Sequence, residues 1–102
     1  MMRVGVPAPT PQYEVWDGLL LVGRADFGWE ELRTLGEFDG KMKYSELVRP
    51  DQTAADVVYA EKCREDALRD LGWQVVRWGW TDLKDPPELR RRLERAFQRG
   101  QA

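Results

Sequence analysis

The segment QYEVWDGLLLVGRADF, residues 12–27, contains two strand-like runs on either side of Asp17-Gly18. Asp-Gly between apolar runs is a strong hairpin signal, because both turn positions of the tightest hairpins require a positive φ. We therefore expect a β-hairpin with strands over residues 12–16 and 19–27. This hairpin opens the predicted fold.

The remaining segments predict an order of strand, helix, strand and helix. After a second reversal at FGWEE, we expect a third strand over residues 32–39, a helix over residues 53–71, a strand over residues 73–78 and a last helix over residues 88–98. Thr53 is a suitable cap for the first of these helices, and Gly72 follows its last turn. WQVVRW, residues 73–78, is mostly apolar on both faces, which favours an interior strand. The predicted fold class is α+β: a mixed four-stranded sheet in the order β-β-β-α-β-α.

One side of the helix predicted over residues 53–71 is mainly apolar. At 100° per residue, Arg64 falls on the same side, where a solvated arginine would not be expected. The apolar residues in this arc are Val57, Ala60, Cys63, Ala67, Leu68 and Leu71.

Length and composition limit the classes of protein. A chain of 102 residues forms one domain, expected over residues 12–102, and the prolines in residues 1–11 predict a flexible arm before it. No histidine is present, which excludes Ser-His and Cys-His hydrolases and histidine-based zinc sites. The single cysteine excludes an internal disulfide. No apolar run approaches the roughly 20 residues of a membrane span, so we expect no membrane association and a cytoplasmic location.

Three carboxylates are expected to lie close together. Asp26 ends one predicted strand, whereas Glu37 and Asp39 lie two residues apart on the next and share a face. Such a group suits Mg²⁺, which binds one or two carboxylates and leaves positions for water and phosphate. Lys41, two residues further on, could stabilise charge on a phosphate. From spacing alone, ordinary turn chemistry remains an alternative for all three acidic residues.

A set of motifs resembles one nuclease family. The motifs are Asp26-Phe27, Glu37-Phe38-Asp39-Gly40, Arg64 and Gly72-Trp73-Gln74-Val75-Val76-Arg77. Together they resemble the PD-(D/E)XK restriction-endonuclease-like superfamily, in the uncharacterised bacterial branch similar to the very-short-patch repair endonuclease. EFDGKMKY, residues 37–44, also resembles a subgroup whose longer members carry an N-terminal winged-helix region. That region resembles antitoxins of abortive-infection systems.

The resemblance implies metal-dependent hydrolysis of DNA, in phage defence or repair. Asp26 and Glu37 would hold Mg²⁺ or Mn²⁺, with Asp39 as a further ligand or support. Lys41 or Lys62 would replace the lysine of the family pattern. Arg64 would orient a carboxylate or contact phosphate. From the residues alone, Arg64 could equally be a structural arginine whose stem covers the core and whose head pairs with Glu61 or Asp39. The arginines expected to contact nucleic acid are Arg64, Arg77, Arg91, Arg92 and Arg95.

The chain also departs from the family pattern. Asp39 stands where the pattern has lysine, the repair endonuclease relies on histidines, and the family's usual first helix is replaced here by the proline-rich arm. The chain is then either a fragment of a longer protein or lacks part of the site. A second hypothesis is therefore a catalytically inactive module that binds nucleic acid or protein, such as a toxin–antitoxin accessory domain. The arginines of residues 88–98 also fit a solvated helix face, and whether the chain forms a homodimer stays open.

Overall fold

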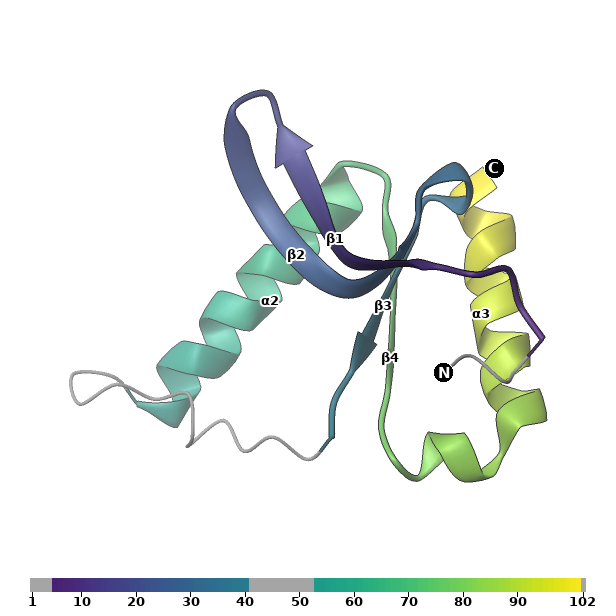
Figure 1. Cartoon of the computed structure of the whole chain (residues 1–102). Coiled ribbons are helices and arrows are strands. Elements are labelled where there is room, and N and C mark those ends of the chain that lie inside the picture. Colours follow the sequence, from purple (N-terminus) through teal and green to yellow (C-terminus); the bar gives the residue numbers. More distant parts are fainter. Residues whose placement is uncertain (1–4, 41–52, 102) are drawn as a thin grey trace.

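The computed structural model describes residues 5–40 and 53–101. The strands are β1 (Thr10–Asp17), β2 (Leu20–Trp29), β3 (Thr34–Phe38) and β4 (Gln74–Trp78), and the helices are α2 (Ala54–Asp70) and α3 (Pro86–Gln101), with short 3-10 helices η1 (Glu30–Leu32) and η2 (Asp82–Lys84) (Figure 1). The predicted α+β class and order of elements are confirmed.

The four strands form one mixed sheet in the order β1-β2-β3-β4. β1 pairs antiparallel with β2, β2 antiparallel with β3, and β3 parallel with β4. The predicted reversal at Asp17-Gly18 joins β1 and β2, but Asp17 is paired with Leu20 and the turn itself is formed by Gly18 and Leu19. Of these two residues only Gly18 has a positive φ, +61°, rather than both as predicted. The meander and the crossover through α2 therefore follow the sequence-based prediction.

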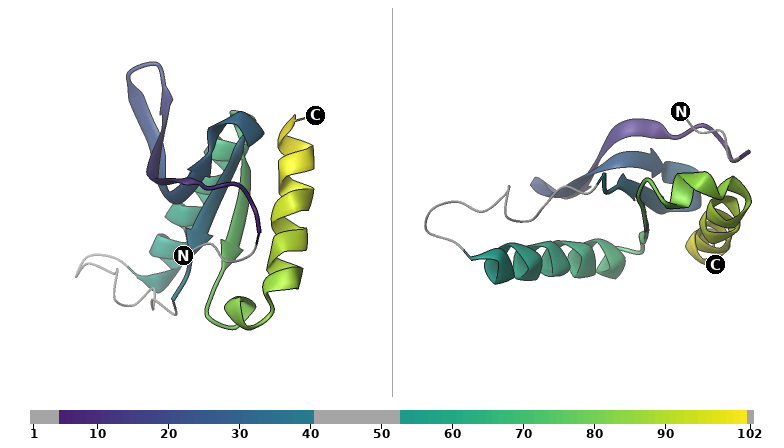
Figure 2. Two further views of the ribbon diagram at one scale, coloured as in Figure 1. Left: turned by 45° about the vertical axis from the view of Figure 1, so that its right-hand side comes forward. Right: turned by 90° about the horizontal axis from the view of Figure 1, so that it is seen from below.

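The prediction that residues 73–78 form an interior strand is wrong. Within the described residues, β4 lies at an edge of the sheet, next to β3 alone. It is apolar on both faces because β3 and β4 lie between α2 and α3 (Figures 1 and 2). Val75 packs with the cluster that contains Leu68 of α2, whereas Val76 and Trp78 pack with α3. A strand that is covered on both faces has the same apolar pattern at the edge of a sheet as in its middle.

Two apolar clusters hold the layers together. The first joins Trp29, Val76 and Trp78 of the sheet to Leu89, Leu93, Ala96 and Phe97 of α3. The second, on the side of α2, contains Val15, Ala25, Leu35, Leu68 and Trp73. Burying such side chains supplies the main favourable term in folding, about 1.5–3 kcal/mol for each large residue.

α2 begins as the sequence predicts but packs differently. The backbone N–H of Asp56 donates to the side-chain hydroxyl of Thr53, and the backbone N–H of Thr53 donates to the Asp56 carboxylate. The helix therefore has a complete capping box. Of the residues in this helix, all of which the structure describes, only Leu68 is buried. Ala60 and Cys63, expected on the packed side, are exposed.

The part of the predicted arm that the structure describes lies against the core. Val6 packs on the first cluster, and the indole N–H of Trp29 donates to the carbonyl oxygen of Pro7 at 2.8 Å. Thr10 and Pro11, expected in the arm, belong to β1. No helix in the described parts of the chain has both the length and the apolar character needed to cross a membrane.

Candidate functional site

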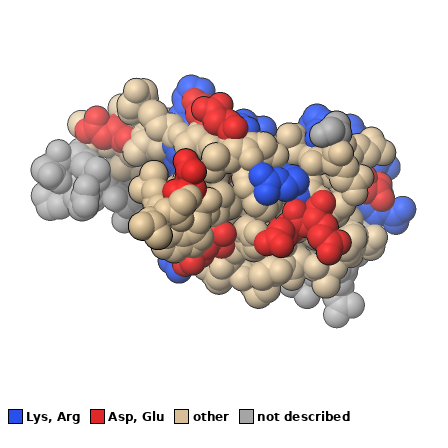
Figure 3. All heavy atoms as spheres, turned by 90° about the horizontal axis from the view of Figure 1, so that it is seen from above, with Lys and Arg blue, Asp and Glu red and all other residues tan. Residues whose placement is uncertain are grey.

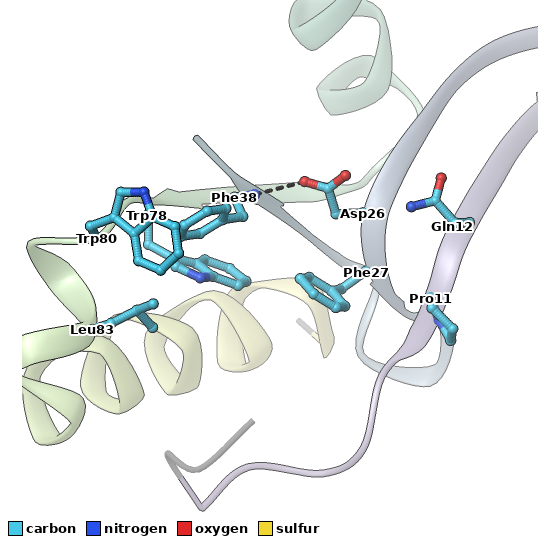
Figure 4. Close-up of a pocket in the computed structure, with 8 residues that line it drawn as sticks. All are labelled: Pro11, Gln12, Asp26, Phe27, Phe38, Trp78, Trp80 and Leu83. Carbon is cyan, nitrogen blue, oxygen red and sulfur yellow. Dashed lines mark hydrogen bonds between the residues drawn. The ribbon is translucent and has the colours of Figure 1, made fainter. Parts of the chain in front are cut away.

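Asp26 lies where β2 and β3 separate. The ladder between these strands ends at the pair Phe27–Gly36, and β2 continues beyond it paired with β1. The Asp26 carboxylate occupies the gap: its Oδ2 atom accepts from the backbone N–H of Phe38 at 2.8 Å (Figure 4). The hydrogen bond satisfies a strand N–H that would otherwise lack its ladder partner. It also fixes the Asp26 carboxylate beside the β3 backbone, next to the residue that separates Glu37 from Asp39.

A cavity of about 450 Å³ opens beside this carboxylate. Its aromatic wall combines a perpendicular pair, Phe38 and Trp80, whose ring centroids are 4.9 Å apart, with a near-parallel pair, Phe27 and Trp78, at 5.8 Å. Asp26 and Gln12 lie at the opposite end (Figure 4). The site therefore combines one carboxylate with flat apolar surfaces.

Gln12 has an unusual backbone conformation at this cavity. It lies between the pairs Pro11–Phe27 and Tyr13–Ala25 of β1 and β2, across from the position of Asp26. Its φ of +51° lies in the left-handed region that residues other than glycine seldom adopt. Such strain costs free energy and is concentrated at functional sites.

Glu37 takes part in an ion-pair network rather than in a group of carboxylates. Its Oε2 atom lies 2.7 Å from Nη2 of Arg64, and its Oε1 atom lies 3.4 Å from Nη2 of Arg77. Arg64 also lies 3.1 Å from Glu61, and Arg77 lies 2.7 Å from Glu61 and 3.0 Å from Glu65. We call Glu37, Glu61, Arg64, Glu65 and Arg77 the α2 ion-pair network. The Glu37 side chain is only 17% exposed, so these contacts are partly shielded from water.

The α2 ion-pair network also connects the two separating strands. Nη2 of Arg64 donates to the carbonyl oxygen of Arg24 in β2 at 3.0 Å and to Glu37 in β3. Gly23 allows this approach, because a Cβ atom there would lie 3.2 Å from the Arg64 side chain. Arg64 therefore spans the opening between β2 and β3 from the side of α2.

Burial and opposite charges act in opposite directions on the pKa values of Glu65 and Arg77. Burial opposes ionisation of Glu65, but its hydrogen bonds from Arg69 and Arg77 and their positive charges outweigh burial and lower its pKa. Burial likewise disfavours charged Arg77, whereas its hydrogen bond to Glu61 and the charges of Glu37, Glu61 and Glu65 raise its pKa. Both groups are thus held in their charged forms.

The structure does not assemble the expected three-carboxylate metal site. Within residues 5–40 and 53–101, no three acidic or cysteine side chains are grouped so that they could hold a metal ion. The sequence-based prediction of Glu37 as a ligand conflicts with its two arginine partners. Asp26 and Asp39 retain the oxygen chemistry that Mg²⁺ accepts, since Asp26 has a second oxygen and Asp39 is exposed at the end of β3. Glu37 does not join them, because both of its carboxylate oxygens face arginines.

Only one of the two predicted lysines, Lys62, belongs to the described residues. Lys41 lies outside the described residues. Lys62 is 73% exposed on α2, with its Nζ atom 3.7 Å from Asp66 one turn further along the helix. This geometry is that of an ordinary surface pair, which contributes little to stability.

The predicted nucleic-acid-binding arginines differ in their surroundings. Arg64 and Arg77 belong to the α2 ion-pair network, and Arg92 pairs with Asp82 at 3.0 Å and donates to the carbonyl oxygen of Arg77. Arg91 and Arg95 are more than half exposed, although both approach Glu88. Seen from above, acidic and basic side chains are interspersed (Figure 3). The visible face therefore offers no continuous basic surface.

The sequence predicted Glu61 as one possible partner of Arg64, and their 3.1 Å contact confirms it, but the contributions of Gln12 and Glu65 were missed. Glu65 could have been recognised, because positions 61, 64 and 65 share one face of a helix and the arginine between them needs partners. The positive φ of Gln12 has no comparable signal in the sequence.

Comparisons of the chain with protein-family models, with curated proteins and with solved structures find no match. The family resemblance of the motifs therefore stays a prediction.

Proposed function

We propose that this chain is a metal-dependent nuclease domain that hydrolyses phosphodiester bonds of DNA in the cytoplasm. The observation that carries the proposal is the hydrogen bond from the Phe38 backbone to Asp26, which fixes a carboxylate in the gap between β2 and β3. A meander followed by a helix and a parallel strand supports the restriction-endonuclease-like interpretation of the fold. Phage defence and repair are roles compatible with this activity.

Asp26 and Asp39 are the residues that would hold Mg²⁺ or Mn²⁺. Mg²⁺ commonly binds proteins through one or two carboxylates, keeping several waters and taking oxygens from a substrate phosphate. When bound, such an ion would polarise a phosphoryl oxygen and lower the pKa of a water molecule that it binds. The Phe38 N–H orients the Asp26 carboxylate by occupying Oδ2, which leaves its other oxygen for the ion. Asp39 is exposed and therefore accessible to both ion and substrate.

Glu37 takes a positioning role in this proposal. Its contacts with Arg64 and Arg77 hold the end of β3 against α2 and β4. Because Arg64 also binds the Arg24 carbonyl, the α2 ion-pair network keeps β2 and β3 at a fixed separation. The gap that contains Asp26 is thereby maintained without a ligand.

The test is cleavage of labelled single-stranded and supercoiled DNA with Mg²⁺ or Mn²⁺. Asp26→Asn and Asp39→Asn should each abolish metal-dependent cleavage, and the first keeps an oxygen that can accept from Phe38. Asp17→Asn, an exposed acid at the end of β1, is the matched control and should cleave like the wild type. Cleavage by Asp26→Asn at the wild-type rate would refute the proposal.

One observation favours a second candidate function. The pairing of Glu37 with two arginines would also suit a domain that keeps the fold and binds nucleic acid or protein without catalysis, such as a toxin–antitoxin accessory domain. This candidate predicts DNA or protein binding that is independent of divalent ions, with no cleavage by the wild type. The cleavage assay above, combined with binding in a chelator, separates the two.

A further inference from the structure

The cavity beside Asp26 has a division of surfaces that its role in packing does not explain. Its aromatic end is formed by the rings of Phe27, Phe38, Trp78 and Trp80. The Trp80 side chain is 56% exposed. Its polar end carries the Asp26 carboxylate and the Gln12 amide (Figure 4). The volume, about 450 Å³, falls within the range of roughly 300–1,000 Å³ that is usual for ligand sites.

We propose that this pocket binds an unpaired nucleobase, so that the substrate is single-stranded or locally unpaired nucleic acid. This inference rests on the proposed nuclease function for the identity of the ligand. Its physical basis lies in the walls of the pocket and in its position next to Asp26.

The aromatic end is suited to stacking. Trp80 is held against Phe38 with their ring planes at 85°, so its orientation is set before any ligand arrives. Aromatic side chains that present a free face to solvent stack on bases, and every base has such a face. An aliphatic ligand would bury the same rings but would leave the polar end without partners.

The polar end is suited to the edge of a base. A carboxamide can donate and accept at once, as glutamine does when it pairs with adenine. Gln12 supplies the amide from a strained backbone position opposite Asp26. Base edges in a duplex already pair with one another, so only an unpaired base can present its edge and its ring face here.

The position of the pocket links base binding to the proposed chemistry. Asp26 belongs both to the wall of the pocket and to the gap where β2 and β3 separate. A base stacked on Trp80 therefore brings a neighbouring phosphate of its own strand towards Asp26. Base stacking would select the substrate, and a metal ion held by the carboxylates would polarise the phosphate beside it.

The experiment measures binding without metal. A labelled oligonucleotide of about 12 nucleotides, within the range of single-strand sites, and its duplex form are titrated with protein in EDTA at low ionic strength, followed by fluorescence anisotropy. The single strand should bind more tightly than the duplex. Trp80→Ala should weaken single-strand binding by about 5- to 100-fold, the usual effect of losing one stacking partner, whereas Trp80→Phe should restore most of it.

Trp16→Ala is the matched control, because Trp16 is 52% exposed on β1 and does not line the pocket. It should bind like the wild type. Equal losses in Trp80→Ala and Trp16→Ala, equal affinity for duplex and single strand, or no binding of either DNA would overturn the inference. This binding assay does not depend on cleavage. A protein that shows the expected binding pattern but is inactive in the cleavage assay would refute the nuclease proposal and leave the base pocket standing.

Discussion

Removing the Arg64 guanidinium should destabilise the fold more than removing any surface arginine. Arg64 donates to Glu37, Glu61 and the Arg24 carbonyl, and its side chain is only 21% exposed. Hydrogen bonds to charged groups contribute roughly 1.5–3 kcal/mol each when shielded, and partial exposure lowers that contribution. We therefore expect Arg64→Met to lower the free energy of unfolding by about 2 kcal/mol, which corresponds to about 8–16 °C in melting temperature for a domain of this size.

The assay is urea unfolding followed by tryptophan fluorescence, with Arg91→Met as the matched control. Arg91 also pairs with a glutamate, Glu88, but its side chain is 57% exposed. Its loss should therefore change stability by less than about 0.5 kcal/mol. If the two variants unfold at the same urea concentration, the α2 ion-pair network does not hold β2 and β3 as described.

Three further predictions concern acid, alkali and the core. The pKa of Glu65 is lowered, so its contribution to stability is complete above its ordinary pKa and disappears as the pH falls through the lower folded value; Glu65→Gln should flatten the acid side of a curve of unfolding free energy against pH. Burial and the neighbouring Glu30 raise the pKa of Tyr13 to about 12, so its contribution is complete below the ordinary tyrosine value and is lost as the pH rises through about 12; phenolate absorbance should contain a late transition that Tyr13→Phe removes. Leu93 is fully buried against the sheet, so Leu93→Ala should lower the free energy of unfolding, measured in urea, by about 2–5 kcal/mol. A loss below about 1 kcal/mol would contradict the assigned core.

Local signals in the sequence predicted most of the fold. The Asp17-Gly18 turn and the Thr53 cap depend on residues close in sequence, so their chemistry is visible without tertiary contacts. The edge position of β4 was not predictable in this way. Helices on both faces give its residues the apolar pattern of a central strand, and nothing local to the strand reports which neighbours it has.

The sequence predicted where Asp26 lies relative to β3 but not the partners of Glu37. Asp26 was expected beside residues 37 and 39, and its hydrogen bond to Phe38 does bring it to that part of β3. The partners of Glu37 come from α2 and β4, far along the chain, and therefore could not be inferred from the spacing of the acidic residues. The position of Arg64 within an otherwise apolar arc was the one signal that such a partner was needed.

The most direct test of the account is a titration with Mg²⁺ or Mn²⁺ followed by thermal unfolding. If Asp26 holds the ion and Glu37 only positions β3, the melting temperature of the wild type should rise with ion concentration as expected for binding to the folded state. The rise should be lost in Asp26→Asn and retained in Glu37→Gln. A wild-type melting temperature that does not respond to either ion, or an equal rise in Asp26→Asn, would contradict the central claim that Asp26 carries a metal-dependent site.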